Sequence, residues 1–380
     1  MKVIKNARVY VENKGLIKTD LQFNNNVCDI NDNLNGEIID IPSNAVVLPA
    51  FIDMHIHGAG NADLMDGTEK ALRTLSETLS KEGTTAFLTT TLTESKENLI
   101  ASLSVVKNYI SNQSEFGAEV LGVHLEGPFI SKTFKGAQPE QHILQPNVQV
   151  FDEFYNASGN TIKTVTLAPE IEGADELIKH LNKLNVIPAV AHSNATFSQV
   201  QHAVDIGLKG ITHTFNAQSP LHHRDIGVVG AGFLLDELYS ELIADTIHVS
   251  VPAMKLLFKN KPDGKIVLVT DALRLKGLTD GKMVMGGQNV TLKDGQARLD
   301  NGALAGSVIG MNTAIKNLIE KVGISFEKAV DCATINPARV LKVNDKRGSI
   351  SVGKKADFAI INDNFDVLYT IKNGNIIYKA

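Results

Sequence analysis

The sequence has few cysteines and no long apolar runs. Its 380 residues contain only two cysteines, Cys28 and Cys332, which lie far apart. This pattern offers no disulfide framework and is typical of ordinary thiols in a reducing compartment. No apolar run approaches the roughly 18 residues that a membrane-spanning helix needs, and the first residues lack the apolar segment of a signal peptide. We therefore expect a cytoplasmic protein with no membrane partner.

The sequence also lacks an excess of positive charge. Its 37 Lys and Arg residues are outnumbered by 42 Asp and Glu residues, which gives a net charge of −5, and the two signs are mixed along the chain. Because there is no basic stripe, nucleic acid is not an expected partner. Hydrophobic residues (43%) and charged residues (21%) are close to the averages of folded globular proteins. The composition therefore excludes a disordered chain.

The middle of the chain alternates between β-rich runs and amphipathic helical stretches. This alternation is typical of βαβ units around a parallel sheet, and several runs are almost wholly apolar, as strands buried on both faces are. The sequence therefore predicts a (β/α)8 barrel of the TIM type, with a doubly wound open sheet as the alternative. The eight candidate strands are Val46–His57, Thr84–Leu92, Glu119–Glu126, Ile162–Glu170, Val186–His192, Gly210–Thr214, Leu238–Asp245 and Lys265–Asp271.

Both ends of the chain have the pattern of antiparallel β structure. Residues 2–23 contain short β-like runs broken by Asn and Gly, and residues 348–379 alternate between apolar and polar positions. We expect the two ends to pair into one small β-sandwich domain, formed by residues 1–52 and 342–380, beside a barrel formed by residues 53–341. A β excursion is expected over Gly277–Gly302, because Asp294 and Gly295 form a hairpin-type turn sequence.

Histidines recur at the carboxyl ends of the predicted strands, where barrel enzymes carry their catalytic groups. Strand one ends in His55 and His57, whose side chains point to the same side of the strand. Strand five ends in His192, and strand six contains His213. Imidazoles that converge from separate strands suit Zn or Fe. Each histidine alone is more often structural, but the joint pattern favours a metal site.

Three carboxylates also stand at strand ends. Glu126 and Glu170 end strands three and four, and the spacing does not decide which of them completes the metal site. Asp271 ends strand eight and is the candidate general base. A metal lowers the pKa of a bound water to about 7, and a nearby carboxylate can accept the water's proton and later hand it to a leaving amine. The structural alternative is that Asp271 caps a following helix.

Two loops carry groups that suit an anionic ligand. His222, His223 and Arg224 form a small basic cluster after strand six, and Arg can bind phosphate through two N–H groups. The alternative is an exposed loop without a ligand. The segment Leu304–Ser307 either presents backbone N–H groups to a ligand or starts a helix, and the pattern alone favours the helix. The Gly-rich run at 227–232 does not follow a strand as a dinucleotide-binding loop does, so a dinucleotide site is not expected.

A set of motifs resembles a known family. The segment PAFIDMHIHG at 49–58 resembles the opening motif of the amidohydrolase superfamily. Further motifs are similar to the N-acetylglucosamine-6-phosphate deacetylases within it: HLEGPF at 124–129, KGAQ at 135–138, AHSNAT at 191–196, THTFNA at 212–217, VTDA at 269–272 and LAGS at 304–307. The likeness spans nearly the whole chain, because it continues through NPARVL at 336–341 and GSISVGKKADFAII at 348–361.

The resemblance implies a metal-dependent amide hydrolase that converts N-acetylglucosamine 6-phosphate to glucosamine 6-phosphate and acetate. It selects Glu126 over Glu170 as the acidic ligand and gives Asp271 the catalytic role. One or two divalent ions are implied, with Zn or Fe preferred, and the presence of His55 and His57 favours two. The implied metal ligands are His55, His57, Glu126, His192 and His213.

The resemblance also implies substrate-binding positions. Arg224 and His248 match the phosphate- and sugar-binding positions. Family members are commonly homodimers, in which Arg224 would reach into the neighbouring site. Gln138 stands where some members carry His, which leaves its role in polarising the substrate carbonyl open. The full implied set is Ala137, Gln138, Asn216, Ala217, Arg224, Asp245, His248, Leu304, Ala305 and Gly306.

Two other functions compete with this interpretation. One is another amidohydrolase that acts on a different N-acyl or cyclic amide. Many such enzymes bridge two metals with a modified Lys, whereas Pro169 and Glu170 end strand four here. The other is a non-catalytic scaffold on the same barrel. Relatives of that kind usually lose ligands, whereas this chain keeps five matching ligands and Asp271.

Overall fold

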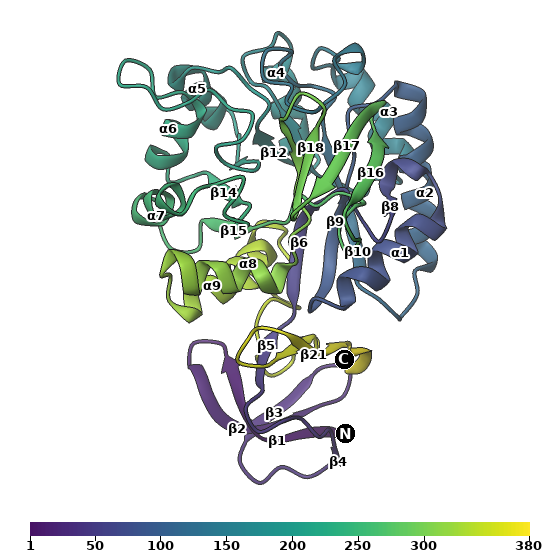
Figure 1. The fold of residues 1–380 in the computed structure, drawn as a ribbon, viewed down its shortest axis with the longest axis vertical. Helices are drawn as coiled ribbons and strands as arrows, with labels where there is room; N and C mark the ends of the chain where they lie inside the picture. Colours follow the sequence, from purple (N-terminus) through teal and green to yellow (C-terminus); the bar gives the residue numbers. More distant parts are fainter.

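The structure is a computed structural model that describes residues 1–380. Its centre is a parallel β-barrel surrounded by helices (Figure 1). Eight strands form one hydrogen-bonded sheet in the order β15-β14-β13-β12-β11-β10-β9-β6. The predicted barrel and its eight strands are confirmed. The strands are β6 (Phe51–Ile56), β9 (Thr84–Thr90), β10 (Glu119–Glu126), β11 (Ile162–Leu167), β12 (Ile187–Val190), β13 (Gly210–Ile211), β14 (Tyr239–Leu242) and β15 (Ile266–Leu268).

The barrel closes between its first and last strands. The backbone N–H of Asp271 donates to the carbonyl oxygen of His55 at 2.8 Å, and the N–H of His57 donates to the carbonyl oxygen of Ala272 at 3.0 Å. The carboxylate of Asp53 accepts the hydroxyl of Thr270 at 2.5 Å. This seam joins segments that are more than 200 positions apart in the chain, and it lies at the strand ends that carry the candidate site.

The first predicted strand, Val46–His57, is wrong in one respect, because it is two strands of different sheets. β5 (Val46–Pro49) belongs to the small β domain, and β6 enters the barrel. The change occurs at Pro49, which has no N–H for a sheet ladder. Directly after it, the N–H of Ala50 donates to Asp357 of the small domain, and the N–H of Phe51 donates to Gly83 of the barrel.

Helices cover the outside of the barrel, and most of them begin at a capping side chain. Thr68, Ser95 and Ser250 accept the backbone N–H three residues on, as do the caps of three further helices. The helices are α1 (Glu69–Ser80), α2 (Lys96–Asn112), α3 (Val148–Ala157), α4 (Ala174–Lys183), α5 (Phe197–Asp205), α6 (Gly227–Leu234), α7 (Val251–Asn260), α8 (Met311–Asn317), α9 (Phe326–Ala333) and α10 (Ile335–Val340), with short turns η1 (Leu64–Asp66), η2 (Glu140–His142) and η3 (Leu318–Val322). None of these helices has the length and apolar character needed to traverse a lipid bilayer.

The two ends of the chain form one sheet below the barrel in Figure 1. Its order is β22-β21-β20-β5-β1-β2-β3, with β4 beside β1. Phe23 and Phe358 come from opposite ends of the chain and pack edge to face at 5.1 Å, which confirms the predicted pairing of the ends. The strands are β1 (Lys2–Val11), β2 (Gly15–Phe23), β3 (Val27–Asn31), β4 (Glu37–Ile38), β20 (Phe358–Ile361), β21 (Val367–Lys372) and β22 (Asn375–Lys379).

The predicted β excursion is also present. It is a four-stranded antiparallel sheet, drawn in green in front of the barrel in Figure 1. Asp294 and Gly295 form its tight turn with φ angles of 50° and 73°. Leu304–Gly306 is a strand of this sheet, so the preference for a helix start there was wrong; α8 begins only at Met311. The strands are β16 (Gly281–Met285), β17 (Gln288–Lys293), β18 (Gln296–Leu299) and β19 (Leu304–Gly306); the pair β7 (Gly58–Ala59) and β8 (Ala62–Asp63) follows β6.

Candidate metal centre and active site

Of the five side chains predicted as metal ligands, the four imidazoles surround the carboxylate of the fifth, Glu126. Its Oε1 lies 2.9 Å from Nε2 of His213, 3.3 Å from Nε2 of His192 and 3.6 Å from Nε2 of His55. Its Oε2 lies 3.2 Å from Nε2 of His57. Two of the five residues come from β6 and the position directly after it, one ends β10, and two lie in the loops after β12 and β13. All are buried, so this arrangement is built by the barrel itself.

Glu170, the other carboxylate that the spacing allowed, does not join this cluster. Its Oε2 accepts the hydroxyl of Ser193 at 2.7 Å, and its Oε1 accepts the N–H of Asn194 at 2.6 Å. It therefore holds the loop that follows β12. The structure brings Glu126, and not Glu170, to the histidines.

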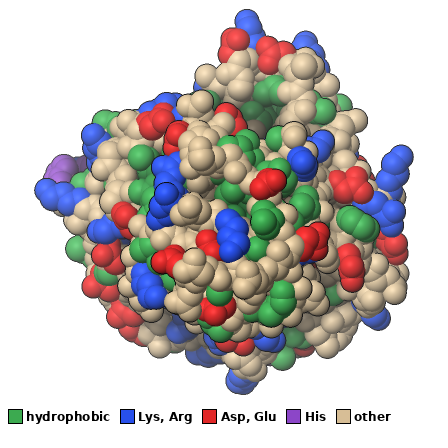
Figure 2. Space-filling model, turned by 90° about the horizontal axis from the view of Figure 1, so that it is seen from below, with side chains coloured by type: hydrophobic (Ala, Val, Ile, Leu, Met, Phe, Trp, Pro, Cys, Tyr) green, Lys and Arg blue, Asp and Glu red, His purple; other side chains and the backbone are tan.

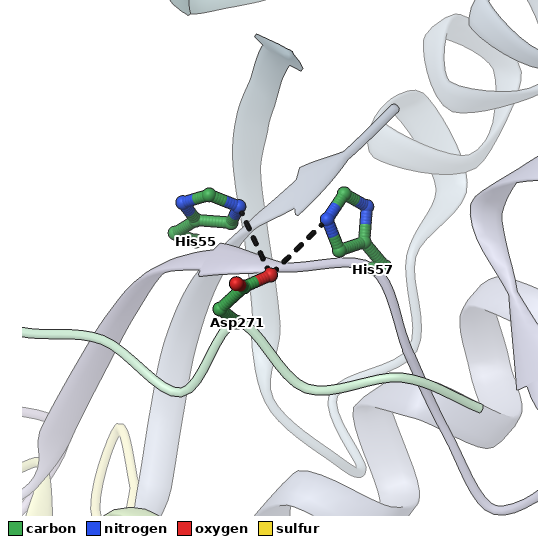
Figure 3. Close-up of side chains that lie close together, drawn as sticks. All are labelled: His55, His57 and Asp271. Atoms are coloured by element: carbon green, nitrogen blue, oxygen red, sulfur yellow. Dashed lines mark ion pairs between the residues drawn. The ribbon is translucent and has the colours of Figure 1, made fainter. Parts of the chain in front are cut away.

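Asp271 faces the pair at the end of β6. Its Oδ1 lies 3.4 Å from Nε2 of His55 and 3.2 Å from Nε2 of His57 (Figure 3). No helix begins at Asp271, so the capping alternative is excluded. The carboxylate is therefore free to face the histidines from the opposite side of the barrel seam.

Three residues of this cluster have strained backbones. The φ angles of His192, His213 and Asp271 are 48°, 31° and 46°, in the left-handed region that side chains with a Cβ rarely adopt. For this reason the predicted strands five, six and eight end before these residues rather than at them. Strain of this kind is concentrated at functional sites, where the surrounding structure holds it.

The chemistry of the donor set fits a divalent metal. Nε2 of His55 is buried and has no hydrogen-bond partner, although it lies at the centre of the cluster. Nδ1 of the same ring lies 3.0 Å from Oε2 of Glu241, and Nδ1 of His192 lies 3.0 Å from the carbonyl oxygen of Phe134. Such partners place the ring proton on Nδ1 and leave Nε2 as a lone-pair donor, as metal-binding histidines require. Three groups of three side chains lie close enough to share an ion. They are His55, His57 and Asp271; Glu126, His192 and His213; and His55, His124 and Glu241.

The histidines and carboxylates of the cluster stabilise each other's charged forms. Burial acts to lower the pKa of His55, but the carboxylates of Asp271 and Glu126 outweigh it and raise that pKa to about 9. Burial is likewise outweighed at His57, whose hydrogen bonds to Asp271 and Glu126 raise its pKa to about 10. Burial would raise the pKa of Glu126, yet the surrounding histidines hold it well below its usual range. Without a metal, the rings of His55 and His57 are therefore protonated, and these protons occupy positions that a cation would take.

A cavity of about 150 Å³ opens above the cluster. Asp271, His57 and Glu126 form part of its wall, so a small ligand in the cavity can reach them. Gly136 also lines it, and sequence reasoning missed this residue; a methyl group there would come within 3.3 Å of the His192 ring. The predicted substrate-binding residues that line the cavity are Ala137, Gln138, Asn216, Ala217, His248, Leu304, Ala305 and Gly306.

Two predicted substrate-binding residues do not line this cavity. Asp245 instead supports His248, because its Oδ2 lies 2.6 Å from Nδ1 of that ring and its Oδ1 accepts the N–H groups of Ile247 and His248. Arg224 is exposed in the loop before α6, where its Nη1 lies 2.9 Å from Nε2 of His223. A His side chain and basic side chains project together at the left edge of the molecule in Figure 2. The structure does not bring Arg224 to the cavity of its own chain.

Glu241 and Asp53 are buried carboxylates that sequence reasoning missed. Oε2 of Glu241 lies 3.2 Å from the backbone N of His213, in addition to its contact with His55. Asp53 accepts the N–H of His55 and the N–H and hydroxyl of Thr270. Both could have been singled out from the sequence, because a carboxylate inside an otherwise apolar predicted strand must find a partner when it is buried.

His124 lies beside this cluster but is satisfied without a metal. Its Nε2 lies 2.7 Å from the hydroxyl of Thr166, and its Nδ1 lies 3.3 Å from the carbonyl oxygen of Met54. Burial holds its pKa well below the usual range, so the ring is neutral. We therefore regard His124 as a packing residue behind His55.

The chain is similar in sequence and structure to known enzymes. The Amidohydrolase family matches residues 46–377. An N-acetylglucosamine-6-phosphate deacetylase of Bacillus subtilis is 40% identical over 342 residues, which cover 90% of this chain and 86% of that protein. An N-acetylgalactosamine-6-phosphate deacetylase of Escherichia coli O157:H7 is 35% identical, with 85% of each chain covered. The crystal structure of N-acetylglucosamine-6-phosphate deacetylase from Pasteurella multocida is similar over the whole length of both chains, with a TM-score of 0.94 and 30% identity.

Proposed function

Because the chain belongs to the amidohydrolase family, we propose that it is the enzyme that hydrolyses the acetamide of N-acetyl-D-glucosamine 6-phosphate. The products are D-glucosamine 6-phosphate and acetate, so the reaction belongs to amino-sugar catabolism and cell-wall sugar recycling. The observation that carries the proposal is the position of Asp271. Its carboxylate lies within 3.4 Å of two imidazoles and lines the same cavity as Glu126. The similarity to deacetylases over most of the chain supports the same reaction.

His55, His57, Glu126, His192 and His213 would hold the metal. A divalent ion supplies Lewis-acid chemistry, because it lowers the pKa of a water molecule and polarises a carbonyl group. Asp271 has a pKa below its usual range despite burial, because the nearby His55 and His57 stabilise its charge. It is therefore ionised at neutral pH and can accept a proton from the attacking water. The same carboxyl group then delivers this proton to the departing nitrogen of the sugar.

Gln138 is oriented to act at the acetyl group. Its Oε1 accepts the N–H of Thr93 at 2.7 Å, so the direction of the amide is fixed. Its Nε2 donates to Oε2 of Glu126 at 2.8 Å, which leaves its second amide hydrogen for another acceptor. Since Gln138 lines the cavity, this hydrogen can meet the acetamide carbonyl. We propose that Gln138 thereby takes the place of the His that some family members carry.

The metal content and the oligomer are further parts of the proposal. Two of the three groups, His55 with His57 and Asp271 and Glu126 with His192 and His213, support two ions per subunit. The third contains His124, whose ring nitrogens already have partners. Imidazoles with carboxylates suit Zn or Fe. Arg224 lies on an exposed loop away from its own cavity. We propose a homodimer in which this residue binds the substrate phosphate of the neighbouring subunit, while His248 contacts the sugar. The free Cys28 and Cys332 support a cytoplasmic location.

The decisive experiment measures acetate release from N-acetylglucosamine 6-phosphate by protein of defined metal content. The galactosamine epimer is the first comparison, because one relative is named for that substrate. Release of acetate that requires the metal supports the proposal. Metal-replete protein that releases no acetate, but cleaves a cyclic amide or a dipeptide, supports the rival amidohydrolase. Natively purified, well-folded protein without metal supports the scaffold alternative.

A further inference from the structure

A second cavity lies at the other end of the barrel. Its volume is about 440 Å³, and it is lined by residues at the amino ends of β12, β13, β14 and β15 and by the end of α10. The metal-binding cluster lies at the carboxyl ends of the same parallel strands. The two sites are therefore separated by the length of the barrel core, and nothing in the proposed reaction uses the second cavity.

The lining of this cavity is strongly cationic. It contains Lys209, Lys265, Arg339 and Lys342, against the single carboxylate of Glu237. None of the four cations forms an ion pair with a carboxylate of the protein. Nζ of Lys265 donates to the backbone carbonyl oxygen of Glu237 at 3.0 Å, which fixes this ammonium at the wall. Four cations gathered in a hollow with one carboxylate repel one another, and an anionic ligand would relieve this repulsion.

We propose that this cavity is a second binding site for a small phosphate monoester. The cations bind the phosphate, with Arg339 able to donate two parallel N–H groups. The volume suits a small metabolite. Nucleic acid is a poorer fit, because basic and acidic side chains are mixed over the lower face of the molecule (Figure 2). The site is independent of the reaction at the metal centre.

The test uses glycerol 3-phosphate as the probe and isothermal titration calorimetry of the metal-loaded protein, with inorganic phosphate as the comparison. We expect saturable binding that the double variant Arg339→Glu, Lys342→Glu weakens at least about tenfold. The neutral variants Lys209→Gln and Lys265→Gln should each weaken it to a smaller extent. Lys70→Glu, an exposed charge reversal on α1 outside the cavity, is the matched control and should bind like the wild type.

The location of the binding site is tested by chemical acetylation of the lysines with and without glycerol 3-phosphate, followed by mass spectrometry. Lys209 and Lys342 should be protected, whereas Lys70 should not. The deacetylase kcat/KM of the variants should remain near the wild-type value, because these residues lie far from the metal centre. Equal affinity of the wild type and the charge-reversal variant, absence of saturable binding up to about 10 mM, or unchanged lysine labelling would each overturn the proposal. Tighter binding of inorganic phosphate than of glycerol 3-phosphate would overturn the assignment of the site to a monoester.

Discussion

Nδ1 of His55 lies 3.0 Å from Oε2 of Glu241, although the two residues are 186 positions apart and neither side chain is exposed. The contact fixes the proton of the ring on Nδ1 and directs Nε2 at the metal-binding cluster. Glu241 also accepts the N–H of His213. One buried carboxylate therefore orients groups from both halves of the proposed metal centre.

This contact predicts the effect of changing Glu241. Glu241→Gln retains an acceptor but removes the charge, so metal affinity should fall by about 10- to 100-fold. Competition with a chromophoric chelator measures the affinity. Glu172→Gln, an exposed change on the loop before α4, is the control and should leave it unaltered. Wild-type metal affinity in Glu241→Gln protein would show that the contact only packs His55.

Replacement of Asp271 separates proton transfer from metal binding. Asp271→Asn keeps the shape of the side chain but cannot accept the proton of the water. Turnover should fall by about 10²- to 10⁴-fold, while the ion held by Glu126, His192 and His213 stays bound. Steady-state kinetics and metal analysis of the same sample check both statements, with the exposed Asp236→Asn as control. Near-normal turnover would refute the assignment of the base.

Removal of metal should affect both activity and stability. Chelation should abolish acetate release, and addition of Zn or Fe should restore it. The metal binds the folded chain, so an ion at 100 times its Kd adds about 2.7 kcal/mol to the free energy of unfolding. The thermal midpoint should therefore rise when metal is added to the wild type. The shift should be much smaller in His192→Ala protein, and full activity after complete chelation would contradict a metal mechanism.

The position of Arg224 predicts complementation between subunits. Arg224→Ala should raise KM for the phosphorylated sugar far more than for the unphosphorylated one, because in the proposed homodimer the guanidinium would contact only the phosphate. A hybrid of one Arg224→Ala subunit and one Asp271→Asn subunit should regain one complete site with a nearly normal KM. Kinetics of co-expressed, doubly tagged hybrids measure this. A hybrid that keeps the high KM of the Arg224→Ala parent would place the residue outside the neighbouring site.

Glu119 predicts a pH-dependent contribution to stability at the junction of the two sheets. Burial raises its pKa, but the Arg347 guanidinium and the Lys355 ammonium outweigh this and hold it below its ordinary value of 4.5. The carboxylate therefore stabilises the fold at pH values above about 4.5, and this contribution is lost as pH falls through the lower folded-state pKa. Glu119→Gln should cost about 2 kcal/mol at pH 7 and progressively less at lower pH.

Urea unfolding of the wild type and Glu119→Gln at pH 7 and at about pH 3 measures this difference. Glu115→Gln, four residues earlier and exposed, is the matched control and should unfold like the wild type at both values. A cost that is the same at both pH values would mean that the Glu119 charge contributes nothing.

Much of this architecture could be predicted because it depends on local patterns. The eight strands have apolar runs, and the hairpin at Asp294 has a turn sequence that permits positive φ. The division at Pro49 could not be read from the run Val46–His57, because both strands are buried along their whole length. Only their partners, β20 for β5 and β9 for β6, distinguish them.

The site was predictable to the extent that its side chains follow strands. His55 and Glu126 lie in strands and His57 directly follows one, so their position in the barrel followed from strand order. The partner of His55 did not, since a hydrogen bond over 186 positions leaves no local pattern. The strand at Leu304–Gly306 was missed for the same reason, because it forms by pairing with β18 rather than through its own sequence.

The closure of the barrel has a consequence for how the enzyme is made. Asp53 and Thr270 are bonded across the seam although they are separated by 217 positions, and Asp271 and the β6 histidines meet there. A nascent chain that has emerged only to β14 lacks the Asp271 carboxylate that faces the histidines in the folded protein. With Asp271 as the proposed base, the chain becomes active only after its last barrel strand has docked, and long-range contacts of this kind form slowly. During translation, activity should thus appear abruptly and late, and its appearance would indicate that the barrel has closed.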